Sequence, residues 1–125
     1  YLRPTKDAPH LLTLSFVNNN PKSFTKEELN FYGIPMKIGK YKLFHNAYYP
    51  IVPELPRCEY WLTIFEPAET RRIWIALDDY DPTSNMLQIE TIDLEKGKIT
   101  GTINANFYDR PTLISITNLA FVCSK

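Results

Sequence analysis

The sequence is poor in the residues that build metal centres and nucleophilic active sites. Its 125 residues include two cysteines, Cys58 and Cys123, and two histidines, His10 and His45. None of the four has the close pairing with another ligand that zinc sites use. We therefore expect no metal site and no cofactor. The cysteines leave two alternatives open: one long-range disulfide in an oxidising compartment, or two buried thiols that pack as small hydrophobic side chains.

Excess charge and long apolar runs are also missing. Fourteen Lys and Arg residues balance fourteen Asp and Glu residues, so the formal net charge is zero. A protein that binds nucleic acid usually carries a positive surplus that displaces counterions from phosphates. The balance therefore argues against a nucleic-acid partner and against a strongly anionic membrane surface. No apolar run approaches the ~20 residues that span a bilayer. The chain opens at Tyr1 without the start of a signal peptide, which we interpret as a processed or truncated product.

The sequence does contain many short segments in which apolar and polar residues alternate. Hydrophobic residues make up 44% of the chain, which is typical of a globular protein. Alternation with a period of two is the pattern of a half-buried strand. The segments are 11–17, 29–34, 40–44, 60–65, 73–77, 87–89, 99–108 and 112–123. They predict an all-β fold, an antiparallel β-sandwich or small barrel of about eight strands.

Two segments fall outside this pattern. Residues 23–30 are the helix candidate, because Thr25 and Glu28 fit a capping box. The segment is too short to be a stable helix alone, so we expect at most one short helical turn. Residues 1–10 have no periodicity and are expected to be an N-terminal arm or linker. Residues 11–125 are expected to form a single β domain.

The segment 99–108 has the clearest alternation in the chain. Its apolar face is expected to meet the core and consists of Ile99, Gly101, Ile103, Ala105 and Phe107. Its polar face consists of Thr100, Thr102, Asn104, Asn106 and Tyr108. We expect this face to meet solvent or, alternatively, to line a binding groove, with Asn104 and Asn106 as candidate ligand-binding residues. A hairpin turn at Gly97 precedes the segment, and a bulge is expected near Asn118.

Aromatic residues supply a second candidate binding surface. Tyr48 and Tyr49 lie in the proline-interrupted loop 46–56, where exposed rings can act as flat platforms for sugars or peptides. Trp61 and Trp74 alternate with aliphatic residues, which favours core packing for both. We therefore consider Tyr48 and Tyr49 the better candidates for a ligand.

Catalytic and calcium motifs are weak. Asp78, Asp79 and Asp81 share a loop, but their spacing is not that of an EF-hand, and we expect a solvated acidic turn. There is no G-x-S-x-G nucleophile motif. A pair of carboxylates depends on spatial separation, and the glutamates near the proline-rich loop would be the ones to examine. They are Glu54, Glu59, Glu66 and Glu69. We expect a protein that is not an enzyme.

Three segments resemble a known group of proteins. They are 34–43, 87–108 with its turn at 95–98, and 114–121. Their order and patterns resemble the C-terminal meander of small Bacteroidota lipoproteins of unknown function, with Leu119 where that pattern usually has Gly. The resemblance implies an all-β domain held outside the cytoplasm by a lipidated cysteine upstream of this chain. It implies no catalytic residues.

Together these observations predict a noncatalytic extracytoplasmic module of the lipoprotein type that binds an unknown ligand or has a structural role. The alternative is a surface carbohydrate-binding module that uses the loop aromatics Tyr48 and Tyr49. The expected partner is a glycan or an envelope protein. Contact with the membrane is expected only through the upstream lipid anchor, either facing the periplasm or at the cell surface.

Overall fold

The computed structural model describes residues 1–45, 54–78, 84–109 and 111–125. Within these ranges it contains ten strands and no helix, so no described helix has the length and apolarity to cross a bilayer. The strands are β1 (Leu2–Thr5), β2 (Ala8–Asn20), β3 (Thr25–Pro35), β4 (Gly39–Lys42), β5 (Phe44–His45), β6 (Arg57–Phe65), β7 (Thr70–Ile75), β8 (Met86–Asp93), β9 (Lys98–Asp109) and β10 (Thr112–Ser124).

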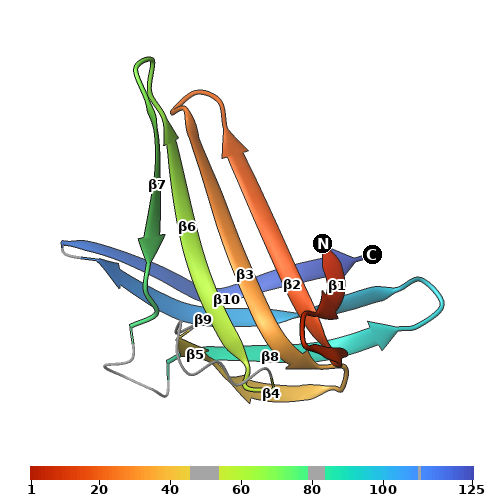
Figure 1. Cartoon of the computed structure of the whole chain (residues 1–125). Coiled ribbons are helices and arrows are strands. Elements are labelled where there is room, and N and C mark those ends of the chain that lie inside the picture. The colour runs from red at the N-terminus through yellow and green to blue at the C-terminus, as the bar shows by residue number, and fades with distance from the viewer. Residues whose placement is uncertain (46–53, 79–83, 110) are drawn as a thin grey trace.

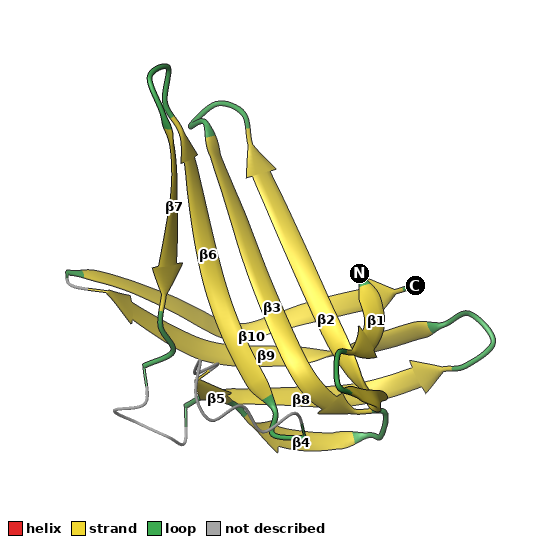
Figure 2. Ribbon diagram, in the orientation of Figure 1, coloured by secondary structure: helices red, strands yellow, loops and turns green. Residues whose placement is uncertain are grey.

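The strands form two sheets (Figure 1). The six-stranded sheet has the order β1-β2-β3-β6-β5, and β7 pairs with the far end of β6. The four-stranded sheet has the order β10-β9-β8-β4. The pairings are antiparallel except for a short parallel contact between β5 and β6. Figure 2 shows that the strands of one sheet run across those of the other, as in β-sandwiches with orthogonal packing. The fold is therefore an all-β sandwich, as the alternation predicts.

The core lies where the two sheets face each other. Leu14, Phe31 and Cys58 of the six-stranded sheet are fully buried. Ile103 and Phe107 of β9 are fully buried opposite them. The rings of Tyr60 and Phe107 pack across the interface with their centroids 5.5 Å apart. Cys58 and Cys123 are both buried thiols and form no disulfide with each other, the second of the two alternatives for the cysteines.

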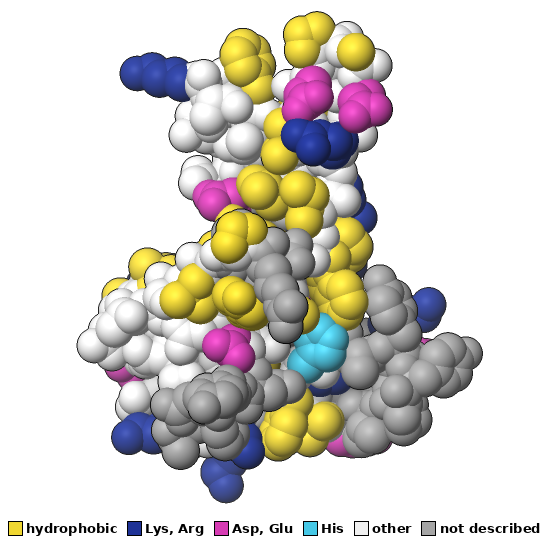
Figure 3. Space-filling view, turned by 90° about the vertical axis from the view of Figure 1, so that its left-hand side faces the viewer, with side chains coloured by type: hydrophobic (Ala, Val, Ile, Leu, Met, Phe, Trp, Pro, Cys, Tyr) yellow, Lys and Arg dark blue, Asp and Glu magenta, His cyan; other side chains and the backbone are white. Residues whose placement is uncertain are grey.

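One part of the six-stranded sheet extends past the four-stranded sheet. The four-stranded sheet, with strands spaced ~4.8 Å apart, is roughly 15–20 Å wide. The 13 residues of β2, at ~3.4 Å each, extend about 44 Å. Because the sheets cross, the ends of the β2–β3 and β6–β7 hairpins have no opposite layer (Figure 1). We call this part, residues 17–28 and 62–73, the overhang. Seen from the side of β7, it is a narrow column above a wider base, with hydrophobic side chains exposed along it and at its tip (Figure 3).

One local prediction is wrong. Residues 1–10 are not an arm: they form β1 and the beginning of β2, and Thr5 is buried with its hydroxyl hydrogen-bonded to Thr13 (3.1 Å). Pro4 is tolerated because β1 lies at the sheet edge. Residues 23–30 contain no helix, which agrees with the expectation of at most one short helical turn. Instead, β3 begins at Thr25, because β2 and β6 supply backbone partners on both sides.

The predicted details of β9 are confirmed. Its residues alternate between buried and half-buried from Ile99 to Phe107. Gly97 adopts a φ of 58° in the turn before it. The register between β9 and β10 shifts between Ile116 and Leu119, and Asn118 has a φ of 48°, so the bulge falls where the sequence places it.

A candidate binding groove on the four-stranded sheet

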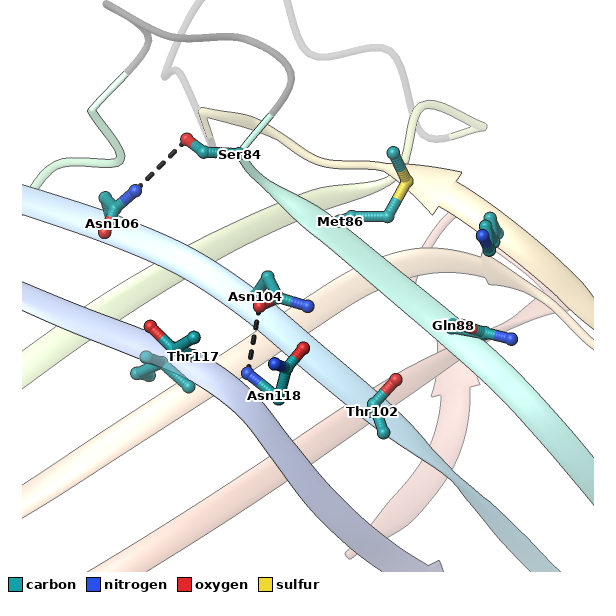
Figure 4. A pocket seen from close by; sticks show the side chains of 10 residues that line it. Ser84, Met86, Gln88, Thr102, Asn104, Asn106, Thr117 and Asn118 are labelled. Atoms are coloured by element: carbon teal, nitrogen blue, oxygen red, sulfur yellow. Dashed lines mark hydrogen bonds between the residues drawn. The ribbon is translucent and has the colours of Figure 1, made fainter.

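The outer face of the four-stranded sheet, turned away from the core, carries a groove of about 500 Å³ (Figure 4). Seven of its ten described lining residues are polar and uncharged. The residues are Lys40, Ser84, Met86, Gln88, Thr102, Asn104, Asn106, Ile116, Thr117 and Asn118. The groove therefore includes the polar face of β9 that the alternation identifies as a candidate, with Asn104 and Asn106 both in it.

Cross-strand pairing brings the lining residues together. Gln88 of β8 lies opposite Thr102 of β9 and, on its other side, opposite Lys40 of β4. Residues directly opposite in antiparallel strands share a face of the sheet. These three side chains therefore form one row across three strands. Met86 and Asn104 form the next row in the same way.

The bulge in β10 fixes the orientation of Asn104. Thr117 and Asn118 are the extra residues between the pairs on either side of the register shift. The backbone N–H of Asn118 donates to Oδ1 of Asn104 (2.9 Å). The amide nitrogen of Asn104 then points away from β10 (Figure 4). The bulge thus holds one amide donor toward the groove.

A second hydrogen-bond chain closes the end of the groove at Asn106. Its Nδ2 donates to Oγ of Ser84 (3.1 Å), and its backbone N–H donates to Oδ1 of Asn85 (2.9 Å). Asn85 is fully buried and donates in turn to the carbonyl of Asp78 (2.8 Å). Asn106 therefore has a structural role, since it ties β9 to the segment before β8.

The centre of the groove keeps unused hydrogen-bonding capacity. The side chains of Gln88 and Thr102 are half-buried and have no hydrogen-bond partner among the described residues. An amide offers donors and an acceptor together, and a hydroxyl offers both as well. Lys40 is the charged side chain in the described lining, and Met86 adds an apolar surface. This arrangement suits a neutral ligand that both donates and accepts hydrogen bonds.

The other candidates from the sequence fall elsewhere. Tyr48, Tyr49, Asp79 and Asp81 lie outside the described residues. Trp61 and Trp74, expected in the core, instead lie half-buried on the outer face of the six-stranded sheet.

An arginine covers one ring of this tryptophan pair, and the glutamates considered for catalysis have partners of their own. The guanidinium of Arg72 lies over the ring of Trp61 (3.9 Å to the centroid) and contacts Glu28 (3.0 Å). Of the glutamates named as a possible catalytic pair, Glu66 forms an ion pair with Arg71 (2.6 Å), and Glu59 accepts a hydrogen bond from Tyr32 (2.5 Å). Each of these carboxylates thus has a partner within its own sheet.

Sequence reasoning missed several members of the groove. The local sequence does not determine how β4 and β8 align with β9. It therefore could not place Gln88, Lys40 and Met86 beside the polar face of β9. Asn85 resembles an ordinary turn residue, although it is fully buried. Asn118 could have been identified from the sequence, because the bulge expected near it places it beside Asn104.

Comparison with protein-family models gives no match, and comparisons with curated proteins and with solved structures give none either. The interpretation of the groove therefore depends on its own geometry. The likeness of three segments to envelope lipoproteins stays an expectation.

Proposed function

We propose that this chain is a noncatalytic binding module and that the outer groove of the four-stranded sheet is its ligand site. The observation that carries the proposal is the row of Gln88 and Thr102, two half-buried polar side chains without hydrogen-bond partners among the described residues. Polar groups that the protein leaves unpaired remain available to form hydrogen bonds with a ligand in place of water. The volume of about 500 Å³ lies within the ~300–1,000 Å³ of small-molecule sites.

The ligand class that fits this lining is a neutral carbohydrate. Each sugar hydroxyl donates and accepts hydrogen bonds, which matches the amides of Gln88 and Asn104 and the hydroxyl of Thr102. Met86 offers an apolar surface to the C–H face of a sugar ring. The proposal retains the carbohydrate-binding alternative but moves the site from the loop aromatics to the outer face of the sheet.

Location outside the cytoplasm and an upstream lipid anchor belong to the same proposal. Their support is the likeness of residues 34–43, 87–108 and 114–121 to small lipoproteins of the cell envelope. Expression of the gene with its upstream sequence, in cells fed a clickable fatty acid, tests this part. Label on the protein supports the anchor, and an unlabelled protein in the cytoplasmic fraction contradicts it.

A glycan array followed by calorimetry tests the ligand class. Gln88→Ala and Thr102→Ala should each weaken binding of an array hit by about tenfold, the effect of losing a hydrogen bond of roughly 1–1.5 kcal/mol. Ser115→Ala is the matched control, because Ser115 lies on the same face but outside the groove lining. An array hit whose affinity is unchanged by both groove variants would place the ligand elsewhere.

A further inference from the structure

The edge strands of the two sheets differ sharply; they are β1, the two-residue β5 and β7 in one sheet and β4 and β10 in the other. β1 has four residues and contains Pro4, β4 has four residues and contains Lys40 and Lys42, and β7 contains Arg71 and Arg72. Charges, proline and short length are the usual means of protecting an edge from pairing. β10 is different: it has 13 residues, none charged and none proline. Leu113, Leu119 and Val122 on it are 59%, 48% and 62% exposed.

The free edge of β10 presents a defined set of backbone groups. The N–H groups of Asn106 and Tyr108 in β9 donate away from β10, to Asn85 and to the carbonyl of Ala76. In an antiparallel pair the direction alternates, so Phe107 exchanges hydrogen bonds with Ile114. The backbone groups of Leu113 and Ser115 therefore point outward, toward a missing neighbour.

The overhang forms a wall beside this edge. A cleft of about 260 Å³ lies between them, lined by Phe16, Val17, Asn18, Glu27, Leu29, Tyr60, Ile114, Ile116 and Leu119. Most of these side chains are apolar. On the overhang, Leu62 and Ile73 lie opposite each other, are half-buried and continue the apolar face. The four-stranded sheet is thus too narrow to cover the inner face of the six-stranded sheet.

The charge in this cleft comes from Glu27. Its carboxylate accepts hydrogen bonds from the hydroxyl of Tyr60 (2.5 Å) and from Nδ2 of Asn18 (3.0 Å). It is half-buried, and Lys26 faces the opposite side of the sheet, where it pairs with Glu28 (2.7 Å). A cation entering the cleft would therefore meet an anchored carboxylate.

We propose that the cleft accepts an extended segment of a partner protein, which adds to β10 as the fifth strand of the four-stranded sheet. Strand addition at an exposed edge gives affinity through backbone hydrogen bonds and specificity through alternate side chains. The incoming segment has apolar residues at alternate positions, packed on Phe16, Ile116 and Leu119, and a Lys or Arg opposite Glu27. A second copy fits this space less well, because pairing β10 with β10 brings a second overhang into it.

A synthetic peptide tests the proposal directly. The probe alternates Val and Thr, has Lys in its centre and carries a fluorescent label; the control peptide has Glu in place of Lys. Fluorescence anisotropy should show tighter binding of the Lys peptide by about fivefold, as for a partly exposed ion pair. Glu27→Gln keeps an acceptor for Tyr60 and should abolish this preference.

Backbone variants then locate the added strand. Ser115→Pro removes an outward N–H that has no partner among the residues that the structure describes, and edge strands tolerate proline. It should weaken the peptide by at least about tenfold, whereas Ser115→Ala leaves binding unchanged. Leu119→Lys, at an exposed position, is a second block that does not depend on proline. Hydrogen exchange should show new protection at Leu113 and Ser115 with peptide bound.

Three results would overturn the proposal. They are no binding of either peptide, binding that survives both Ser115→Pro and Leu119→Lys, and a concentration-dependent dimer that protects the same β10 amides. The groove variant Gln88→Ala should leave peptide binding unchanged, since Gln88 lies on the opposite face of the sheet. The strand site and the glycan site can therefore fail independently.

Discussion

Truncating Phe107 to alanine removes a ring at the centre of the interface between the sheets. Phe107 is fully buried, packs on Tyr60 at 5.5 Å and lies opposite Ile114 of β10. Loss of a buried Phe ring costs roughly 3–5 kcal/mol, from lost burial plus the cavity that remains. Because the ring is fully buried between the two sheets, we expect a cost within this range.

The neighbouring polar position gives a matched comparison. Asn104 is half-buried on the other face of β9 and accepts one hydrogen bond, from the backbone of Asn118 in the bulge. Asn104→Ala should therefore cost about 1 kcal/mol, the value of one partly exposed hydrogen bond. Ser115→Ala, at an exposed site, should stay within about 0.5 kcal/mol.

Urea denaturation of the three variants decides which face of β9 meets the core. The cost of each substitution is calculated from the midpoint of its transition with a common slope. The expected order of cost is Phe107→Ala, then Asn104→Ala, then Ser115→Ala. A cost for Asn104→Ala that equals or exceeds that of Phe107→Ala would mean that the faces of β9 are inverted. The groove would then lie in the core, and the reasoning about it would be refuted.

Further outcomes follow from particular contacts. Gly101→Ala should be severely destabilising, because a Cβ there would lie 1.9 Å from the carbonyl oxygen of Gln88 and 2.9 Å from the ring of Phe121; a melting temperature near that of the wild type would contradict this close packing. Burial and the hydrogen bond to Glu27 raise the pKa of Tyr60 above its ordinary value of 10, so its contribution to stability is fully present below pH 10 and is lost as the pH rises through the folded-state pKa. Tyr60→Phe should therefore lessen the loss of stability on the alkaline side, and an unchanged alkaline profile would oppose that cause. A chelator should leave the melting temperature unchanged, whereas a drop of several degrees would reveal a bound metal.

The alternation of apolar and polar residues predicted the strands that have one solvent-facing and one buried face. β9 is the clearest example, because Ile103 and Phe107 pack inward while Thr102 and Asn104 face out. The bulge was predictable for a related reason, since the apolar phase changes near Asn118. Period-two patterning reports burial directly, which explains this success.

Elements that depend on distant partners were not predictable. Residues 2–5 form β1 because β2 lies beside them, and Thr25 begins a strand because β6 lies on the other side of β3. The same limit applies to the groove. Asn104 and Asn106 were named from β9 alone, but Gln88 joins them through a register that two separate strands set together.

An NMR titration tests most directly the claim that the outer groove is the ligand site. The side-chain amide resonances of the protein are followed while a neutral oligosaccharide selected on the array is added. We predict that the side-chain amides of Gln88 and Asn104 shift together and saturate, while that of Asn18, in the cleft beside β10, does not move. Saturating shifts confined to residues outside the outer groove, with Gln88 and Asn104 unmoved, would contradict the claim that this groove is the ligand site.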